Sequence, residues 1–195
     1  MKTLAKLSFA VLAIGLTAFS AQAQSSSYKW GVGVRAGEPS GISIKKYNGS
    51  NAWELNVGRA RYWTYAYDYD YYFRHDNRYK DYKYLGYRGH TGLNVQLRKL
   101  WSKNLPDVNN LNWYYGIGGQ LFTNSYYYKY KDENDIIRED RYTNFDVGID
   151  GILGLEYFFD EIPISVSLDV NATMLLIDRP LYLFGQSGLG IRYNF

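Results

Sequence analysis

Three kinds of residue are scarce in this chain, which has no cysteine, four prolines and two histidines. Without cysteine it forms neither disulfides nor thiolate metal sites. Its longest apolar run, residues 7–19, is too short and too near the start for a membrane-spanning helix, which needs about 20 apolar residues. No later segment is longer. These absences exclude disulfide scaffolds, thiolate metalloproteins and helical membrane proteins.

The first 23 residues have the features of a secretory signal peptide. Lys2 and Lys6 form a basic start, an apolar core follows, and Ala21-Gln-Ala23 is a small-x-small cleavage site. No cysteine follows the core, so a lipid-anchored protein is excluded. We therefore expect a signal peptide at 1–23 and one exported domain at 24–195. Removing the two lysines lowers the formal charge from +3 to +1, which gives no support for a nucleic-acid partner.

Tyrosine and glycine are abundant, with 22 and 19 residues respectively. Tyrosine favours β-strands and the boundary between water and an apolar phase. Eight segments alternate apolar residues with polar ones or glycine, which is the period of a β-strand. The clearest, 164–173, sets Ile, Val, Leu and Val against Ser, Ser, Asp and Asn. The other seven are 28–36, 42–47, 52–59, 90–101, 112–123, 145–158 and 184–195.

The links between these segments alternate in length. With the first strand starting at the periplasmic side, the short links fall on that side, at 48–51, 102–111 and 160–162. The longer links fall outside, at 61–89, 124–144 and 174–183, and only the turn at 37–41 is short on the outer side. An even number of strands with short inner and long outer links is typical of bacterial membrane barrels. We predict an all-β fold: an eight-stranded antiparallel up-and-down transmembrane β-barrel with a polar lumen.

Periodicity alone does not say which face of the strands is inside. An exported soluble barrel of the lipocalin type alternates in the same way, with its apolar residues inward. Glycines on the polar face suit a crowded narrow lumen, and aromatic residues near the strand ends suit a membrane interface, which favours the membrane barrel. The residues predicted to form the aromatic girdle and the assembly signal are Trp30, Trp53, Trp101, Trp113, Tyr193 and Phe195.

The final strand, residues 184–195, ends on an aromatic residue and resembles the closing strand of bacterial outer-membrane barrels. The Gly-Val-Gly-Val-Arg opening at 31–41 and the Gly-x-Leu-Gly-Leu-Glu-Tyr segment at 151–163 resemble barrels common in Bacteroidota. Residues 24–195 as a whole are similar to small outer-membrane proteins of the OmpA/OmpX kind. This resemblance implies the bacterial outer membrane as location. It also implies membrane lipid, lipopolysaccharide and the barrel-assembly machinery as partners. The sequence departs from OmpA itself in ending at the predicted barrel, so we do not expect the peptidoglycan-anchoring role of OmpA.

The polar face carries charges that must pair if they are buried, because an unpaired buried charge costs several kcal/mol. In an eight-stranded barrel the side chains can fill the interior. The main interpretation is a structural salt-bridge plug, and the alternative is a narrow gated pore for ions or small solutes. The predicted lumen charge cluster is Lys45, Glu54, Arg98, Asp150, Glu156, Asp169 and Arg192, with Asp150 and Asp169 nearer the middle and the other five nearer the periplasmic end.

Two outer regions, 61–88 and 125–142, are rich in tyrosine and are predicted to form projecting hairpins with polar tips at 74–78 and 132–135. Tyrosine supplies rigid contact area and a hydrogen-bonding tip, so these hairpins are candidates for recognition of an extracellular glycan or protein, or for strand addition. In the alternative, the rings pair across strands and contact lipopolysaccharide sugars. The predicted recognition residues are Tyr65, Tyr67, Tyr69, Tyr71, Tyr82, Tyr84, Tyr126, Tyr128 and Tyr130.

Enzymatic signals are weak. The histidines, His75 and His90, show no His-x-Ser arrangement, and the acidic stretch 132–135 lacks the spacing of a calcium loop. We predict no catalytic residue, metal or cofactor. The expected function is a structural and surface-interaction role in the outer membrane. A narrow pore, a lipid-modifying enzyme and a soluble exported ligand-binding barrel are the alternatives.

Overall fold

The computed structural model describes residues 28–60, 83–89, 92–132, 134–177 and 180–195. The predicted signal peptide at 1–23 lies outside these ranges. Every regular element within them is a β-strand. The strands are β1 (Trp30–Gly37), β2 (Ser40–Asn48), β3 (Asn51–Ala60), β4 (Lys83–Gly89), β5 (Gly92–Asn104), β6 (Leu111–Lys131), β7 (Ile137–Phe158), β8 (Ile164–Leu175) and β9 (Leu183–Asn194).

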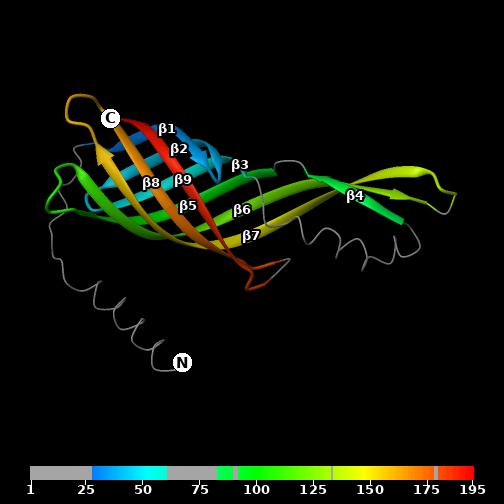
Figure 1. The fold of residues 1–195 in the computed structure, drawn as a ribbon. Coiled ribbons are helices and arrows are strands. Elements are labelled where there is room, and N and C mark those ends of the chain that lie inside the picture. The colour runs from blue at the N-terminus through cyan, green and yellow to red at the C-terminus, as the bar shows by residue number, and fades with distance from the viewer. Residues whose placement is uncertain (1–27, 61–82, 90–91, 133, 178–179) are drawn as a thin grey trace, which may run out of the picture.

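Eight of these strands close into a barrel (Figure 1). Consecutive barrel strands pair antiparallel, with β3 paired to β5 because β4 is not part of the wall, and β1 pairs with β9 to complete the cylinder. The remaining strand, β4, stands outside the barrel and pairs with residues 126–131 of β6. The predicted all-β fold with a closed eight-stranded antiparallel barrel is therefore confirmed.

The seam between β1 and β9 joins the two ends of the barrel sheet. The backbone amides of Lys29 and Trp30 donate to the carbonyl of Phe195, at 3.0 and 2.8 Å, and the amide of Phe195 donates to the carbonyl of Trp30 at 2.8 Å. The register continues with Val32 opposite Tyr193. The first and last strands thus start and finish at the same end of the barrel.

That end also carries the links from β2 to β3, from β5 to β6 and from β7 to β8, and we call it the short-turn end. The two-residue link between β1 and β2, residues 38–39, lies at the opposite end. Gly49, with a φ of 59°, forms the turn between β2 and β3 because this conformation favours glycine. Residues 105–110 join β5 to β6, and residues 159–163 join β7 to β8.

At the opposite end, β6 and β7 are 21 and 22 residues long and stay paired far beyond the barrel wall. Figure 1 shows this ribbon projecting from the barrel, with β4 alongside it. We call the part beyond the wall, residues 123–147, the projecting hairpin. The sequence predicts a projecting hairpin over 61–88 with its tip at 74–78. The structure pairs 83–89 with β6, and because 61–82 lie outside the described residues, that hairpin stays a prediction.

Side chains alternate strictly between the two faces of the barrel wall. In β9, for example, every second residue is buried and the others are exposed. The outward residues are mainly apolar on all eight barrel strands, with Val34 and Ile117 both 62 % exposed. They include Val32, Val34, Ile42, Val57, Leu93, Leu97, Ile117, Leu121, Ile149, Leu153, Leu168, Val170, Leu189 and Ile191. The buried residues of these strands are largely polar or charged.

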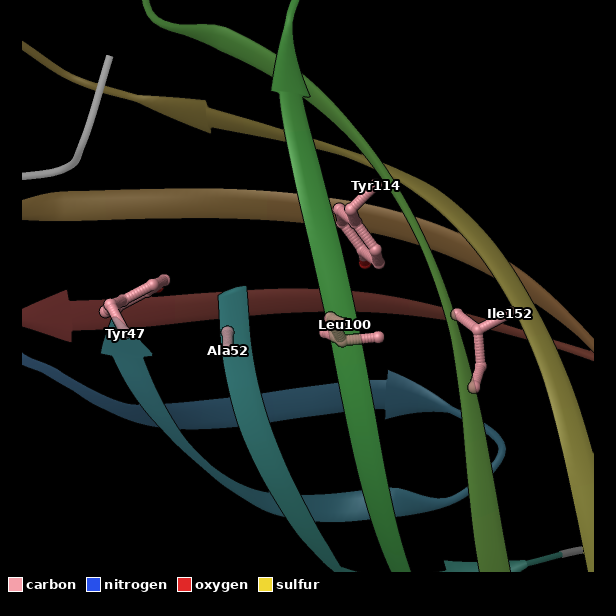
Figure 2. Packing of buried hydrophobic residues seen from close by; sticks show 5 residues of the cluster. All are labelled: Tyr47, Ala52, Leu100, Tyr114 and Ile152. Atoms are coloured by element: carbon pink, nitrogen blue, oxygen red, sulfur yellow. The ribbon is translucent and has the colours of Figure 1, made fainter. Parts of the chain in front are cut away.

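Two small apolar clusters also lie inside the barrel. Figure 2 shows the larger one, which gathers side chains from β2, β3, β5, β6 and β7: Tyr47, Ala52, Leu100, Tyr114 and Ile152. The second cluster consists of Phe122, Leu175 and Phe184, with Tyr182 packed against it. Charged side chains fill much of the remaining interior, and these are the candidate functional groups.

Candidate functional site

The first group of buried charges centres on Arg192 of β9. Its Nη2 donates to Glu54 Oε1 at 2.6 Å, and its Nη1 donates to Glu156 Oε1 at 3.2 Å. Lys45 Nζ donates to the other oxygen of Glu156 at 2.7 Å. Each of these side chains is at most 2 % exposed. Since β2 and β7 lie on opposite walls, the Lys45–Glu156 pair crosses the barrel.

A second group centres on Asp169 of β8. Arg35 makes a two-pronged contact with it, in which Nη1 donates to Oδ2 and Nη2 to Oδ1, both at 2.6 Å. Arg98 Nη1 donates to the same Oδ1 at 3.1 Å, and the Tyr114 hydroxyl donates to Oδ2 at 3.0 Å. The bidentate geometry of Arg35 is the strong form of an arginine–carboxylate contact. One carboxylate thus holds together side chains of β1, β5, β6 and β8.

The third group surrounds Asp150 of β7 and is built mainly from neutral polar residues. Gln96 Nε2 donates to its Oδ2 at 3.0 Å, and the Thr173 hydroxyl donates to its Oδ1 at 2.7 Å. Gln120 Nε2 also donates to Oδ1 of Asp150 and reaches Gln186 Oε1 at 3.1 Å. Amide and hydroxyl donors therefore satisfy this carboxylate, and no cation within the described ranges forms an ion pair with it.

Glycines on neighbouring strands make room for these large inward side chains. A Cβ atom added at Gly188 would overlap the guanidinium of Arg35. At Gly154 it would lie 2.5 Å from Cζ of Tyr114. The polar-face glycines are therefore part of the packing of the charged interior.

The structure buries all seven residues of the predicted lumen charge cluster and distributes them over these three groups. The backbone of Arg98 lies opposite Glu54, with which the sequence grouped it, and its side chain contacts Asp169. The predicted cluster did not include Arg35, although Arg35 is a charge on the same polar face. It also left out Tyr114 and Gln120, which read only as members of a polar face.

The tip of the projecting hairpin is ordered by its own polar groups. Arg138 Nε donates to Asp132 Oδ2 at 2.7 Å, and the other oxygen accepts the amides of Asn134 and Ile136 at 3.0 Å. The bond from Arg138 holds the pKa of Asp132 below its ordinary value, and the backbone amides act in the same direction. A bond from Lys131, at 2.9 Å, lowers the pKa of Asp135.

The predicted recognition tyrosines are described only in part. Tyr65, Tyr67, Tyr69, Tyr71 and Tyr82 lie outside the described residues, as do the side chains of Tyr126 and Tyr128. The backbones of Tyr84 and Tyr130 lie opposite each other on β4 and β6. Tyr130 is 5 % exposed, and its hydroxyl donates to Asp140 Oδ2 at 2.9 Å. Its ring therefore packs within the hairpin, and its hydroxyl ties β6 to β7.

Aromatic residues gather on the outer face near the short-turn end. Trp101 stacks on Tyr115, and Trp113 packs against the same ring, with centroid distances of 5.7 and 5.5 Å. Tyr193 and Phe195 form another pair, with centroids 6.4 Å apart. Trp30 and Trp53 are 40 % and 49 % exposed. All six residues of the predicted girdle thus lie on strands or strand ends at one end of the barrel.

The described part of the chain has no group of three or more His, Cys, Asp or Glu residues arranged to hold a metal ion. Both histidines, His75 and His90, lie outside the described residues. Within the described ranges, no helix is long and apolar enough to cross a membrane.

The chain matches no protein-family model, and a search of curated proteins finds no relative. The expected likeness to small outer-membrane barrels therefore stays a prediction from its residues, and function must be argued from the barrel itself.

Proposed function

We propose that the chain is an integral β-barrel of the bacterial outer membrane with a structural and surface-interaction role. The observation that carries this proposal is the apolar outer face of all eight barrel strands. Soluble monomers rarely expose a contiguous apolar patch larger than a few hundred Å². Insertion into lipid removes this surface from water, which stabilises the protein by about 25 cal/mol per Å² of apolar surface. A soluble barrel would leave the same surface hydrated.

The paired charges inside the barrel support the same proposal. A polar lumen with an apolar exterior is the usual organisation of membrane barrels, whose backbone groups are all satisfied between strands. The aromatic rings at the short-turn end suit the interface between lipid and water. In this orientation the short-turn end faces the periplasm and the projecting hairpin faces the cell exterior. We propose that the small OmpA/OmpX-like barrels are related proteins.

Inside this barrel, the three charged groups act as a structural plug. Arg35, Arg98 and Asp169 join three strands across the interior, and the Lys45–Glu156 pair spans opposite walls. Opening a conducting path would separate buried ion pairs, which costs several kcal/mol per pair. We therefore expect the barrel to conduct no ions in its resting state. Single-channel recording from pure protein in planar bilayers tests this point, and regular conductance steps would favour the pore.

The projecting hairpin is the proposed interaction element, presented to an extracellular glycan or protein. It is a long, paired ribbon with an ordered polar tip, and β4 widens it into a three-stranded sheet. Such a rigid platform lowers the entropic cost of binding. Replacing residues 126–142 by a two-residue Asn-Gly turn removes the platform and leaves the barrel strands intact. Binding to a glycan array or to immobilised lipopolysaccharide should fall in this variant; unchanged binding would contradict the role.

Membrane insertion is tested separately, by expressing the chain with its leader in a Gram-negative cell. The proposal predicts recovery in the outer-membrane fraction after an alkaline wash. It also predicts a folded species that migrates differently on a gel before and after heating. Recovery of folded protein in the soluble periplasmic fraction would overturn the membrane assignment.

A further inference from the structure

Tryptophan and lysine alternate along one row of the outer face near the short-turn end. Trp30 of β1 lies opposite Lys46 of β2, whose other neighbour is Trp53 of β3. Trp53 in turn lies opposite Lys99 of β5. Closer to the short turns, Lys103 of β5 lies opposite Trp113 of β6. We call these residues the Trp–Lys row.

Each lysine in the row rests its ammonium group over a tryptophan ring. The Nζ atoms of Lys46 and Lys99 lie 5.3 and 5.1 Å from the centroids of Trp30 and Trp53. Lys103 Nζ lies 5.8 Å from the centroid of Trp113. A ring face attracts the ammonium cation electrostatically. It does not provide a conventional hydrogen-bond acceptor for the three N–H groups of the lysine. Among the described residues, no carboxylate forms an ion pair with any of these lysines.

The row covers only one side of the barrel. Strands β7, β8 and β9 contain no lysine, and their outward residues near the same end are apolar or aromatic, such as Leu155 and Tyr193. The acidic residues nearest this end, Asp107, Asp160 and Glu161, lie in the turns and not on the outer strand faces. A general interfacial belt would not need such a one-sided arrangement of positive charge.

From this geometry we infer that the Trp–Lys row binds the headgroups of anionic phospholipids in the leaflet at the short-turn end. The inference rests on the proposed membrane insertion. Lys46 and Lys99 flank one strand, so their Cα atoms are about 10 Å apart at about 4.8 Å per strand. A phosphodiester seated over Trp53 accepts hydrogen bonds from ammonium groups on both sides. Its acyl chains then lie along the apolar residues below, which include Val32, Leu55 and Leu97.

The test compares two brominated lipids as quenchers of tryptophan fluorescence. The full mature barrel is reconstituted in phosphatidylcholine vesicles containing brominated phosphatidylglycerol in one series and brominated phosphatidylcholine in the other. The ratio of the two quenching curves gives the relative binding constant of the anionic lipid. Wild-type protein should prefer phosphatidylglycerol, and the preference should weaken as salt screens the lysines.

Charge-matched variants assign the preference to the row. A lysine close to an anionic membrane surface contributes about 1 kcal/mol, so Lys99→Gln should lower the relative binding constant about fivefold. Lys99→Arg should retain it. The triple variant Lys46→Gln/Lys99→Gln/Lys103→Gln should bring the two lipids to parity. The control Lys83→Gln/Lys129→Gln/Lys131→Gln removes the same charge at the opposite end and should keep the wild-type ratio.

The outcomes separate this inference from the membrane proposal. Strong quenching by both lipids with equal binding constants in wild-type protein would overturn the headgroup inference and leave insertion intact. So would an unchanged preference in the row variant, or an equal loss in the control. If neither brominated lipid quenches the tryptophans, the barrel is not inserted, and the proposed function itself fails.

Discussion

Replacing Asp169 by asparagine should destabilise the barrel strongly. The substitution keeps the shape of the side chain but removes the carboxylate that both Arg35 and Arg98 contact, with side chains that are 0 % exposed. It also leaves the Tyr114 hydroxyl facing an amide. Removing one partner of a buried ion pair typically costs about 3–5 kcal/mol, because the remaining charge stays out of water without compensation. We expect a loss of stability in that range.

The assay is urea unfolding of the barrel in detergent micelles or vesicles, followed by tryptophan fluorescence. Asp135→Asn is the matched control: it removes the same group from an ion pair whose carboxylate side chain is 85 % exposed, so its midpoint should stay close to the wild-type value. In a cycle with Arg35→Gln, the double variant should be less destabilised than the sum of the single variants. A loss below about 1 kcal/mol for Asp169→Asn would refute the view that this carboxylate anchors the interior.

Three further results follow from the geometry. Gly188→Ala places a methyl group against the Arg35 guanidinium and should cost about 1–3 kcal/mol in the same urea titration, whereas Gly185→Ala, with no atom within 4 Å of the added Cβ, should cost less. Tyr114→Phe removes the hydroxyl that donates to Asp169 and should cost about 1 kcal/mol by the same assay; no change would show that this bond is not formed. At the hairpin tip, the lowered pKa of Asp132 means that its contribution is complete above the ordinary carboxyl pKa and is lost as the pH falls through the lowered value. The amide NMR signals of Asn134 and Ile136 should shift together over that acidic range, and a titration at or above the ordinary carboxyl value would contradict the Arg138 bond.

The barrel could be predicted from sequence because its signal is repeated. Each strand places apolar and polar residues on opposite faces. One such segment is compatible with many folds, but eight of them, joined by links of alternating length, are compatible with few. Residues 164–173 and 184–195 correspond closely to β8 and β9. The extension of β6 was harder to place, because tyrosines at every position from 126 to 128 hide the period of two.

Side-chain partners inside the barrel were predictable only as a set. The charges on the polar face had to pair if buried, so Lys45, Glu156 and Arg192 could be grouped from sequence. Which carboxylate each arginine contacts depends on strand tilt and register, which alternation does not contain. Arg35 reaches Asp169 across Gly188, and nothing local to Arg35 predicts that contact.

The pairing of β4 with β6 also depends on tertiary structure and not on local sequence. Residues 83–89 have a strand-like composition that suits several partners equally well. Long-range pairing is set by the geometry of the neighbouring wall, and here Tyr87 lies opposite Tyr128 of the projecting hairpin. Sequence patterns predicted that the region was extended, but not the strand that it joins.

The orientation of the strand faces is the central claim, and the absence of native cysteine makes its test direct. Single cysteines at successive positions along β8, from 164 to 173, each carry a nitroxide label in protein reconstituted in lipid vesicles. Collision rates with oxygen, which concentrates in lipid, should alternate with a period of two and peak at Val166, Leu168 and Val170. Low rates at these positions with peaks at Ser165, Ser167 and Asn171, or high accessibility to a water-soluble relaxant at Leu168, would contradict a lipid-facing apolar surface.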